Sequence, residues 1–455
     1  MGAEAMDLIE GATRRAIRPF HEVVYGPRTQ QVLDVSLGRG QMRVGVLRHV
    51  MDGPTECSEF TFAESWLQER RRFGLSPDLR PHTSGQWRKA TLGHGSPFFA
   101  ALADTLPDGF ALAVLDRCLG QSFSRAQQDL DMESRALTNL CAVHDHCRLG
   151  ALRVRPQGKK VSTLPPTIEL PSHVDLDVMF TAITAFEQGE ADPRQLGLLL
   201  SSATSLGGSR PKISFLQDNG SLAVAKFPSV SDTYPVTKAE ALVSQLAKVA
   251  GLQVVEVRLQ HHGRGSVAIT QRFDRRAGDG RQPYLSARSM LLAEEGEEVS
   301  ILDLLNGMRT FCKDFSADAR QLWHRLMFNC LINSADASLR KIGFLYSGGD
   351  RWRLAPAVGL APGMEPRTGE ATPSAPEPGL LGDVEALLRM APAFGLSQAE
   401  ALGILAYMVE VIGRWRTVAA QFAVRMKPVE MDMLEGAMNS VHLQQARERV
   451  GKRRA

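Results

Sequence analysis

The first part of the chain alternates apolar and polar positions. Residues 31–50 follow this period of two, with glycines at 38 and 40 in the middle, which predicts a β-hairpin. Three further stretches predict a strand running into a short helix, a helical stretch broken by a Pro-Asp-Gly turn, and a closing strand, at 58–71, 96–119 and 148–156. We therefore expect a mixed α/β unit from about residue 30 to residue 155.

Two Pro-rich stretches interrupt the pattern. Residues 156–172 are rich in Pro, Lys and Ser, which we interpret as an interdomain linker, and residues 361–379 predict a loose surface loop. Strands and helices alternate between them, and the last part of the chain is helical. Ser397 followed by Glu400 predicts a capping box at the start of a helix that reaches about residue 422.

The charge balance is close to neutral. The 455 residues include 53 basic and 50 acidic side chains, a formal charge of +3. This excess is too small to indicate nucleic-acid binding by itself. Basic residues do gather at the C-terminus, where we interpret the run as a frayed, solvated tail: Arg447, Arg449, Lys452, Arg453 and Arg454.

Cysteine content and hydropathy indicate the compartment. Six cysteines in a chain of this length do not make a disulfide framework, which favours a reducing environment. The first twenty residues lack the apolar core of a secretory signal, and no segment reaches the ~18 consecutive apolar residues of a membrane span. We therefore expect a cytoplasmic protein that does not associate with membranes.

Residues 205–229 carry the most informative pattern. Two short β-rich runs are expected on either side of Gly207-Gly208, and a lysine, Lys226, comes late in the second run. Glycines allow the backbone to approach phosphates closely, and lysines such as Lys212 and Lys226 can neutralise phosphate charge. Many β-hairpins contain Gly-Gly and a lysine without binding any ligand, so this signal needs support from elsewhere.

The order of the following segments supplies that support. Glu240 lies in a helical pattern, and a helix glutamate paired with a strand lysine is the device by which kinases orient the lysine. A β-run at 266–276 can present backbone groups to an adenine edge. An apolar helix then precedes Asp336, and residues 351–362 add a last strand and turn. Gly-rich loop, lysine, glutamate, hinge and catalytic-loop acid follow each other in the order of a protein-kinase-like fold.

These segments resemble the HipA family of bacterial toxin kinases. The resemblance covers nearly the whole chain after about residue 30. The matching motifs are GGSRPK at 207–212, AKFPS at 225–229, RFDR at 272–275, YLSA at 284–287, FN at 328–329, VGVL at 44–47, LPDG at 106–109 and GALRV at 150–154.

The resemblance implies an α+β, two-lobed protein-kinase-like fold with an N-terminal α/β subdomain and a helical C-terminal lobe. The domains it implies are an extension at 1–29, the HipA N-terminal subdomain at 30–155, the linker at 156–172, a kinase-like N-lobe at 173–280, a helical C-lobe at 281–440 and the basic tail at 441–455. It also implies an ATP-binding serine/threonine kinase toxin of a toxin–antitoxin system, whose usual partner is a small helix-turn-helix antitoxin of HipB type.

Site residues are carried over from the same motifs. Asp336 is the implied catalytic residue. The implied nucleotide-binding residues are Ser205, Gly207, Gly208, Lys212, Lys226, Glu240, Gln271 and Phe273. Within this set Lys226 would hold phosphates and Glu240 would hold Lys226. Gln271 and Phe273 would flank adenine, and Ser205 falls at the loop serine that some members autophosphorylate.

The metal-binding positions depart from the family pattern. A histidine and an asparagine of the catalytic loop are replaced by Ser338 and Lys341, and the later acid of the Tyr-Asp pair is replaced by Gly359. Glycine offers no ligand, and a lysine ammonium repels a divalent cation. The same lysine can instead contact phosphate, which would permit nucleotide binding without magnesium.

Two functions follow from this pattern. The first is a pseudokinase that binds ATP, an antitoxin-like partner or a kinase paralogue, reaching nucleic acid only through the antitoxin, with no magnesium site. The alternative is an active serine/threonine kinase toxin that phosphorylates a translation component, using Asp336 and a rearranged metal site to which Asp350 contributes.

One other cluster has metal-binding residue types. Cys141, His144, His146 and Cys147 lie close together in the sequence. Their spacing does not match a standard structural zinc site, and they fall at a helix end just before a strand. We interpret them as structural residues.

Overall fold

The N-terminal strands build a five-stranded antiparallel sheet in this computed structural model, in the order β4-β3-β2-β1-β5. Strands β1 (Thr29–Leu37) and β2 (Met42–Asp52) form the predicted hairpin, with Leu33 opposite Leu47. β3 (Thr55–Phe62), β4 (Gln86–Thr91) and β5 (Leu152–Pro156) complete the sheet. The predictions of this hairpin and of a closing strand at 148–156 are therefore confirmed.

The structure describes residues 29–52, 55–91, 95–123, 134–157, 175–202, 205–276, 280–294, 296–334, 338–364 and 383–454. They belong to two compact units, drawn from residues 1–223, 274–294 and 348–350 and from residues 224–273, 295–347 and 351–455. Almost all of the predicted linker and of the predicted surface loop lies outside the described residues. The predicted domain boundaries remain a prediction.

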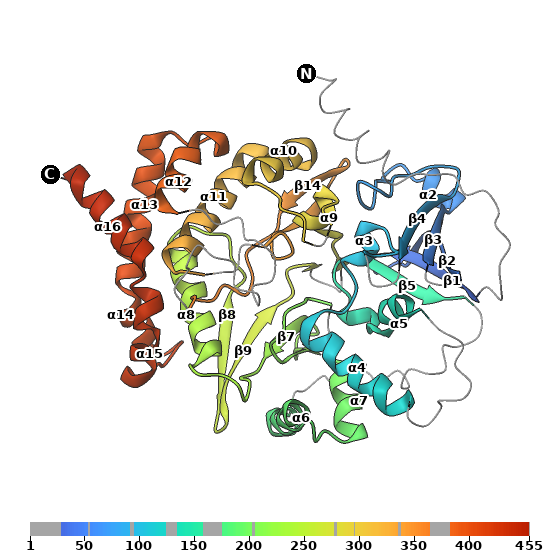
Figure 1. Cartoon of the computed structure of the whole chain (residues 1–455), viewed down its shortest axis with the longest axis horizontal. Coiled ribbons are helices and arrows are strands. Elements are labelled where there is room, and N and C mark those ends of the chain that lie inside the picture. Colours follow the sequence, from blue (N-terminus) through green and yellow to red (C-terminus); the bar gives the residue numbers. More distant parts are fainter. Residues whose placement is uncertain are drawn as a thin grey trace. The chain divides into compact units, whose positions relative to one another are not determined.

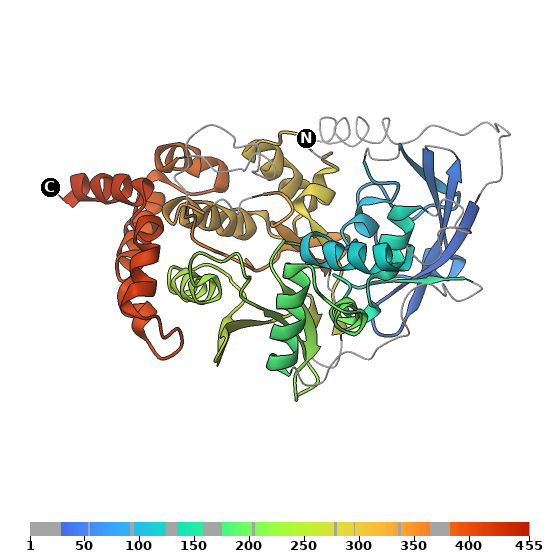
Figure 2. The same cartoon turned by 60° about the horizontal axis from the view of Figure 1, so that its bottom comes forward.

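Some helices of the first unit pack on its sheet, α2 against β2 and α5 against β5. Helices α4 and α5 lie on the same side of the strands (Figure 2), and in the core of this unit Phe60 packs edge-on against Phe62 and Phe99. The helices of this unit are α2 (Glu64–Leu67), α3 (Ala100–Ala103), α4 (Gly109–Phe123), α5 (Arg135–Ala142), η1 (Asp145–Cys147), α6 (Leu176–Gln188), α7 (Pro193–Ser201) and α9 (Ala287–Leu291). The strand-to-helix stretch at 58–71 and the helices around the 107–109 turn are as predicted.

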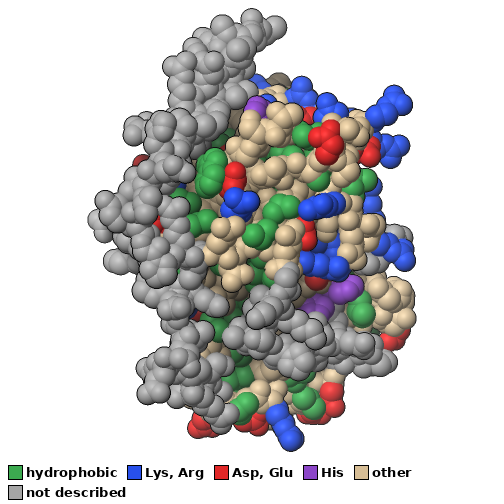
Figure 3. All heavy atoms as spheres, turned by 90° about the vertical axis from the view of Figure 1, so that its right-hand side faces the viewer, with side chains coloured by type: hydrophobic (Ala, Val, Ile, Leu, Met, Phe, Trp, Pro, Cys, Tyr) green, Lys and Arg blue, Asp and Glu red, His purple; other side chains and the backbone are tan. Residues whose placement is uncertain are grey.

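The surface over this sheet mixes charges of both signs. Figure 3 faces the side of the molecule on which the sheet lies, and basic side chains there are interspersed with acidic and apolar ones. Within the sheet, Arg43 of β2 pairs with Asp34 of β1, and Arg48 of β2 pairs with Glu59 of β3. The mixture agrees with the small net charge.

A second, four-stranded sheet has the order β6-β7-β9-β8, of which β7, β8 and β9 are labelled in Figure 1. The boundary between the two units falls within β7. Its strands are β6 (Lys212–Leu216), β7 (Leu222–Lys226), β8 (Val257–His262) and β9 (Gly265–Gln271). Helix α8 (Val236–Val249) packs on β8 and β9, and Thr237 Oγ1 donates a hydrogen bond of 2.7 Å to the Ser266 carbonyl. The short strands are β10 (Arg275–Arg276), β11 (Gly280–Arg281), β12 (Tyr284–Ser286), β13 (Gly343–Gly348) and β14 (Arg351–Leu354).

The remainder of the second unit is helical around α11 (Phe315–Leu331). Trp323 of α11 is fully buried and donates a hydrogen bond of 2.9 Å to the Leu387 carbonyl. The surrounding helices are α10 (Ile301–Phe311), α12 (Val384–Met390), η2 (Ala391–Phe394), α13 (Gln398–Gly413), α14 (Trp415–Ala420), α15 (Pro428–Met438) and α16 (Val441–Arg454). Over the described part of the chain, no helix is long and apolar enough to cross a membrane.

The C-terminal helices begin with a capping box and end in the basic run. The capping box is confirmed, because Ser397 Oγ accepts a hydrogen bond from the Glu400 amide and the Glu400 carboxylate accepts one from the Ser397 amide. The helix that follows is interrupted at Arg414 and is therefore two helices, α13 and α14. The basic run is helical and not frayed, because α16 continues to Arg454, while Arg447 and Arg449 are exposed to solvent as expected.

Candidate functional site

Lys226 and Glu240 form the ion pair that the sequence predicts. Lys226 ends β7, and Glu240 lies in the second turn of α8. The Lys226 ammonium donates to Glu240 Oε1, and the two side chains are only 18% and 6% exposed. Such shelter reduces screening by water, so the pair fixes the lysine more firmly than a surface ion pair would.

Gly359 lies directly beside this ion pair. A Cβ atom built at Gly359 would lie 3.3 Å from Lys226 Nζ, and the glycine has φ +65°. The segment is fixed two residues earlier, where Ala357 forms a parallel bridge with Val254, and its amide and carbonyl bond to the Gln253 carbonyl and the Val255 amide. A carboxylate at position 359 would therefore project next to the lysine, and this chain has none there.

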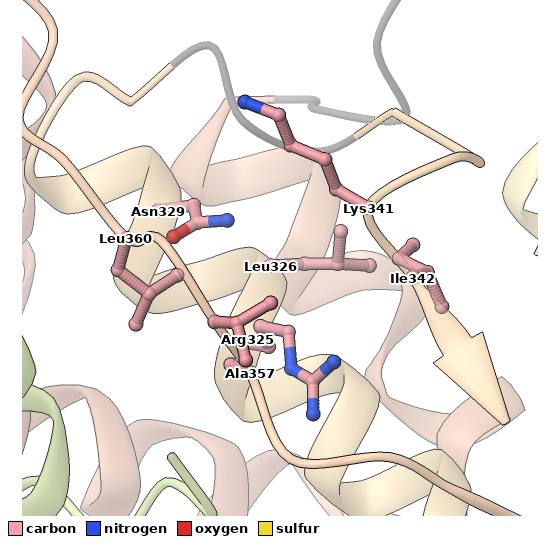
Figure 4. A pocket seen from close by; sticks show the side chains of 8 residues that line it. Arg325, Leu326, Asn329, Lys341, Ile342, Ala357 and Leu360 are labelled. Atoms are coloured by element: carbon pink, nitrogen blue, oxygen red, sulfur yellow. The ribbon is translucent and has the colours of Figure 1, made fainter. Parts of the chain in front are cut away.

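Lys341 borders a narrow pocket in the same unit. The pocket is lined by Arg325, Leu326, Asn329, Lys341, Ile342, Ala357, Val358 and Leu360. Figure 4 shows Lys341 and Leu360 on opposite sides, with Leu326 and Asn329 of α11 between them. The pocket thus lies against the segment that leads into Gly359, and an exposed ammonium group stands at the position where the family pattern has an asparagine.

The loop that carries Asp336 is anchored at its start. Asn333 has φ +56°, and its side-chain amide donates a hydrogen bond of 3.1 Å to the Gly363 carbonyl. The Gly363 amide in turn bonds to the Ile332 carbonyl, at 3.2 Å. Asp336 itself lies outside the described residues, so its position in the site stays a prediction.

The Gly-rich loop differs from the expected hairpin. Gly207 and Gly208, at φ +72° and +87°, precede β6, whereas the turn between β6 and β7 is formed around Gly220. Lys212 Nζ donates to the Gly207 and Gly208 carbonyls, at 2.7 and 2.6 Å. These bonds close the loop on itself before the strand begins, so the two glycines do not lie between paired strands. In this arrangement the Lys212 charge is directed into the loop.

The loop also packs against the LPDG turn of the first unit. The Phe110 amide donates a hydrogen bond of 3.0 Å to the Gly208 carbonyl. A Cβ atom on Gly109 would lie only 2.3 Å from that carbonyl oxygen. Two of the motifs recognised separately in the sequence are therefore in backbone contact.

Ser205 is enclosed in this structure. Its side chain is 5% exposed, and Ser205 Oγ accepts a hydrogen bond of 2.6 Å from the Leu149 amide. Phosphorylation of Ser205 would require the hydroxyl to leave this contact. Its role therefore stays a prediction.

The last two residues of the RFDR motif, Asp274 and Arg275, have a structural role that was not predicted from the sequence. Gln271 ends β9 and is exposed, and Phe273 is half-buried. Asp274 is fully buried and accepts a hydrogen bond of 2.7 Å from the Gly150 amide. Arg275 donates to the carbonyls of His146, Arg148 and Gly150. The two residues thereby hold the GALRV segment in place. The only indication of this role in the sequence is that an acidic and a basic residue are adjacent.

Metal-binding residue types do not gather among the described residues. No group of three His, Cys, Asp or Glu side chains there could hold a metal ion. Burial lowers the pKa of His144, as expected for a structural residue. Asp350 lies in the turn between β13 and β14, where its Oδ1 accepts a hydrogen bond of 3.0 Å from the Gly74 amide.

The chain is similar in sequence and in fold to known proteins. Residues 204–415 match the family model of the HipA-like C-terminal domain. A chain of the Shewanella oneidensis MR-1 toxin–antitoxin complex of HipA, HipB and operator DNA is 17% identical, with a TM-score of 0.60 over 92% of this chain and 97% of that chain. The Helicobacter pylori proinflammatory kinase CtkA is 15% identical, with a TM-score of 0.40 over 54% of this chain and 94% of that chain. No protein of curated function matches. The Shewanella likeness confirms the predicted α+β, kinase-like fold.

Proposed function

Residues 204–415 form a HipA-like C-terminal domain, and on this premise we propose that the protein is a pseudokinase, which binds a nucleotide without transferring its phosphate. The observation that carries the proposal is the placement of Gly359 against Lys226. The phosphate-orienting ion pair is intact, while the neighbouring position that should supply a carboxylate to metal carries no side chain.

The residues fit a nucleotide better than they fit magnesium. Lys226, held by Glu240, would contact phosphate oxygens, and Gln271 and Phe273 would flank the base. Divalent ions bound to nucleotides are held by carboxylate or amide oxygens. Lys341 and Gly359 offer neither. The Lys341 ammonium can offset phosphate charge in place of the ion, because a lysine ammonium attracts phosphate as a point charge.

A partner protein is the second part of the proposal. The Shewanella chain was crystallised with HipB and operator DNA. We propose that this chain likewise binds a small helix-turn-helix protein of HipB type, or a kinase paralogue, and reaches DNA only through such a partner. Co-purification with the product of a neighbouring small open reading frame would support this part.

A phosphoryl-transfer assay tests the proposal. The purified protein is incubated with labelled ATP and either magnesium or manganese, and label on the protein is measured by mass spectrometry. We expect no incorporation, because both ligand positions lack oxygen donors. Labelling at Ser205 that disappears in Asp336→Asn would overturn the proposal in favour of an active serine/threonine kinase.

A further inference from the structure

Helix α8 is held from two sides by ion pairs. Glu240 faces Lys226 on β7, and Lys238, two residues earlier, pairs with Glu430 of α15. Successive helix residues are rotated by about 100°, so side chains two positions apart project from nearly opposite faces. The helix that carries the lysine-orienting glutamate is therefore fastened on its other face to the C-terminal helices.

The contact between Lys238 and Glu430 uses every donor of the lysine. Lys238 Nζ donates to both carboxylate oxygens of Glu430, at 2.7 and 2.8 Å, and to the Arg425 carbonyl, at 3.2 Å. The two side chains are 14% and 20% exposed. A lysine with three satisfied hydrogens in a sheltered position holds its helix in one place, unlike the flexible ion pairs of an open surface.

Glu430 is itself fixed by the start of α15. Its Oε2 accepts a hydrogen bond of 2.7 Å from the Lys427 amide. Helix α14, which leads into this segment, packs along α8 (Figure 1). The attachment point on α15 is thus rigid, and it lies beyond residue 415, where the family match ends.

We infer that Lys238 and Glu430 are positioning residues, through which α14 and α15 set the position of Glu240 and hence the nucleotide affinity of Lys226. The inference rests on the proposed function and adds a control element to it. A partner that displaced α15 would weaken nucleotide binding without touching the nucleotide.

The test compares two charge-removing variants on the same helix. Glu430→Gln removes the charge that holds Lys238 and keeps an oxygen that can cap α15. Glu435→Gln is the matched control, because the Glu435 side chain pairs with Arg416 of α14 and not with Lys238 of α8. Hydrogen exchange of the α8 amides is measured without nucleotide, and mant-ATP affinity is measured by fluorescence.

We expect Glu430→Gln to accelerate exchange in α8 and to weaken mant-ATP binding at least about fivefold, the usual lower limit of coupling between sites. Glu435→Gln should do neither. In a Glu240→Gln background, Glu430→Gln should have no further effect on affinity, because its influence passes through Glu240.

Two results would overturn the inference. One is α8 exchange in Glu430→Gln that equals exchange in Glu435→Gln. The other is an affinity loss of the same size with and without Glu240. If the native protein does not bind mant-ATP at all, the proposed function fails, and the exchange measurement alone decides whether Glu430 positions α8.

Discussion

Among the described residues, Lys226 has a single carboxylate beside it, that of Glu240, because position 359 is a glycine. A metal-dependent kinase site has a further carboxylate that holds the metal ion. Lys226 is already neutralised by Glu240, and a carboxylate at 359 would compete for the same ammonium. With glycine there, the free side of the ammonium is left for an anion. Lys341 adds a second positive charge in the same unit. The arrangement favours phosphate oxygens over a divalent cation.

A buried histidine in the first unit gives a separate test at the residue scale. His49 is 2% exposed, its Nδ1 lies 3.0 Å from Ser58 Oγ, and its Nε2 lies 3.6 Å from Glu56 Oε2. Burial lowers the pKa of His49 to about 4. Burial also raises the pKa of Glu56, against the effect of its hydrogen bond from Ser134.

We predict that His49 makes the fold weaker in acid. Above pH ~6.5 both folded and unfolded chains keep the imidazole neutral; below it only the unfolded chain binds the proton until the pH approaches the folded pKa, so stability falls. From pH 7 to pH 5 the loss is about 2 kcal/mol in the free energy of unfolding. Urea unfolding at both values should show a smaller loss in His49→Gln.

Glu56 acts in the opposite direction, because its raised pKa lets the folded chain take up a proton first as the pH falls. The comparison of slopes between native protein and His49→Gln therefore isolates the histidine. His82→Gln, at an exposed histidine of the same unit, is the control for replacing a histidine by glutamine. Equal slopes in native protein and His49→Gln would contradict the prediction.

At the residue scale, the motifs predicted a contact between two side chains but not the contacts of side chains with the backbone. The pairing of Lys226 with Glu240 followed from the kinase pattern and is present. Lys212 and Ser205 were predicted as ligand-facing, yet both are engaged by backbone groups of their own unit. A backbone partner leaves no trace in sequence, because every residue offers the same amide and carbonyl.

At the scale of elements, the contact between the LPDG turn and the Gly-rich loop sets the strictest steric requirement, because it needs a residue without a side chain. Gly109 has φ +53°, and its missing side chain lets the backbone of Gly208 approach. Gly109 cannot carry a Cβ there without moving the main chain of Gly208 and Ser209. The strands and helices around them were predictable from periodicity, but the meeting of two loops about a hundred residues apart was not.

We predict that Gly109→Ala is clearly destabilising. The new Cβ meets a backbone carbonyl and also sits at a positive φ, and such strain costs about 1–3 kcal/mol. Gly38→Ala is the control, because Gly38 has a similar φ of +69° but open space around it. Chemical denaturation should show a larger loss for Gly109→Ala, and equal losses would mean that the loop yields easily.

At the scale of the whole molecule, the chain divides into two units that are not consecutive in sequence. Residues 274–294 and 348–350 join the first unit although they follow parts of the second. A reading along the chain assigns consecutive domains, because periodicity reports local order only. The same limit hid the Lys238–Glu430 pair, whose partners are 192 residues apart.

The central claim, nucleotide binding that does not depend on metal, is tested most directly by ATP affinity with magnesium and with EDTA. Calorimetry is run on the native protein and on Lys341→Asn combined with Gly359→Asp, with each single variant as control. We expect similar affinities in both buffers for the native protein, and a magnesium-dependent gain only in the double variant, since two ligands must hold the ion. Native binding that requires magnesium would contradict the account.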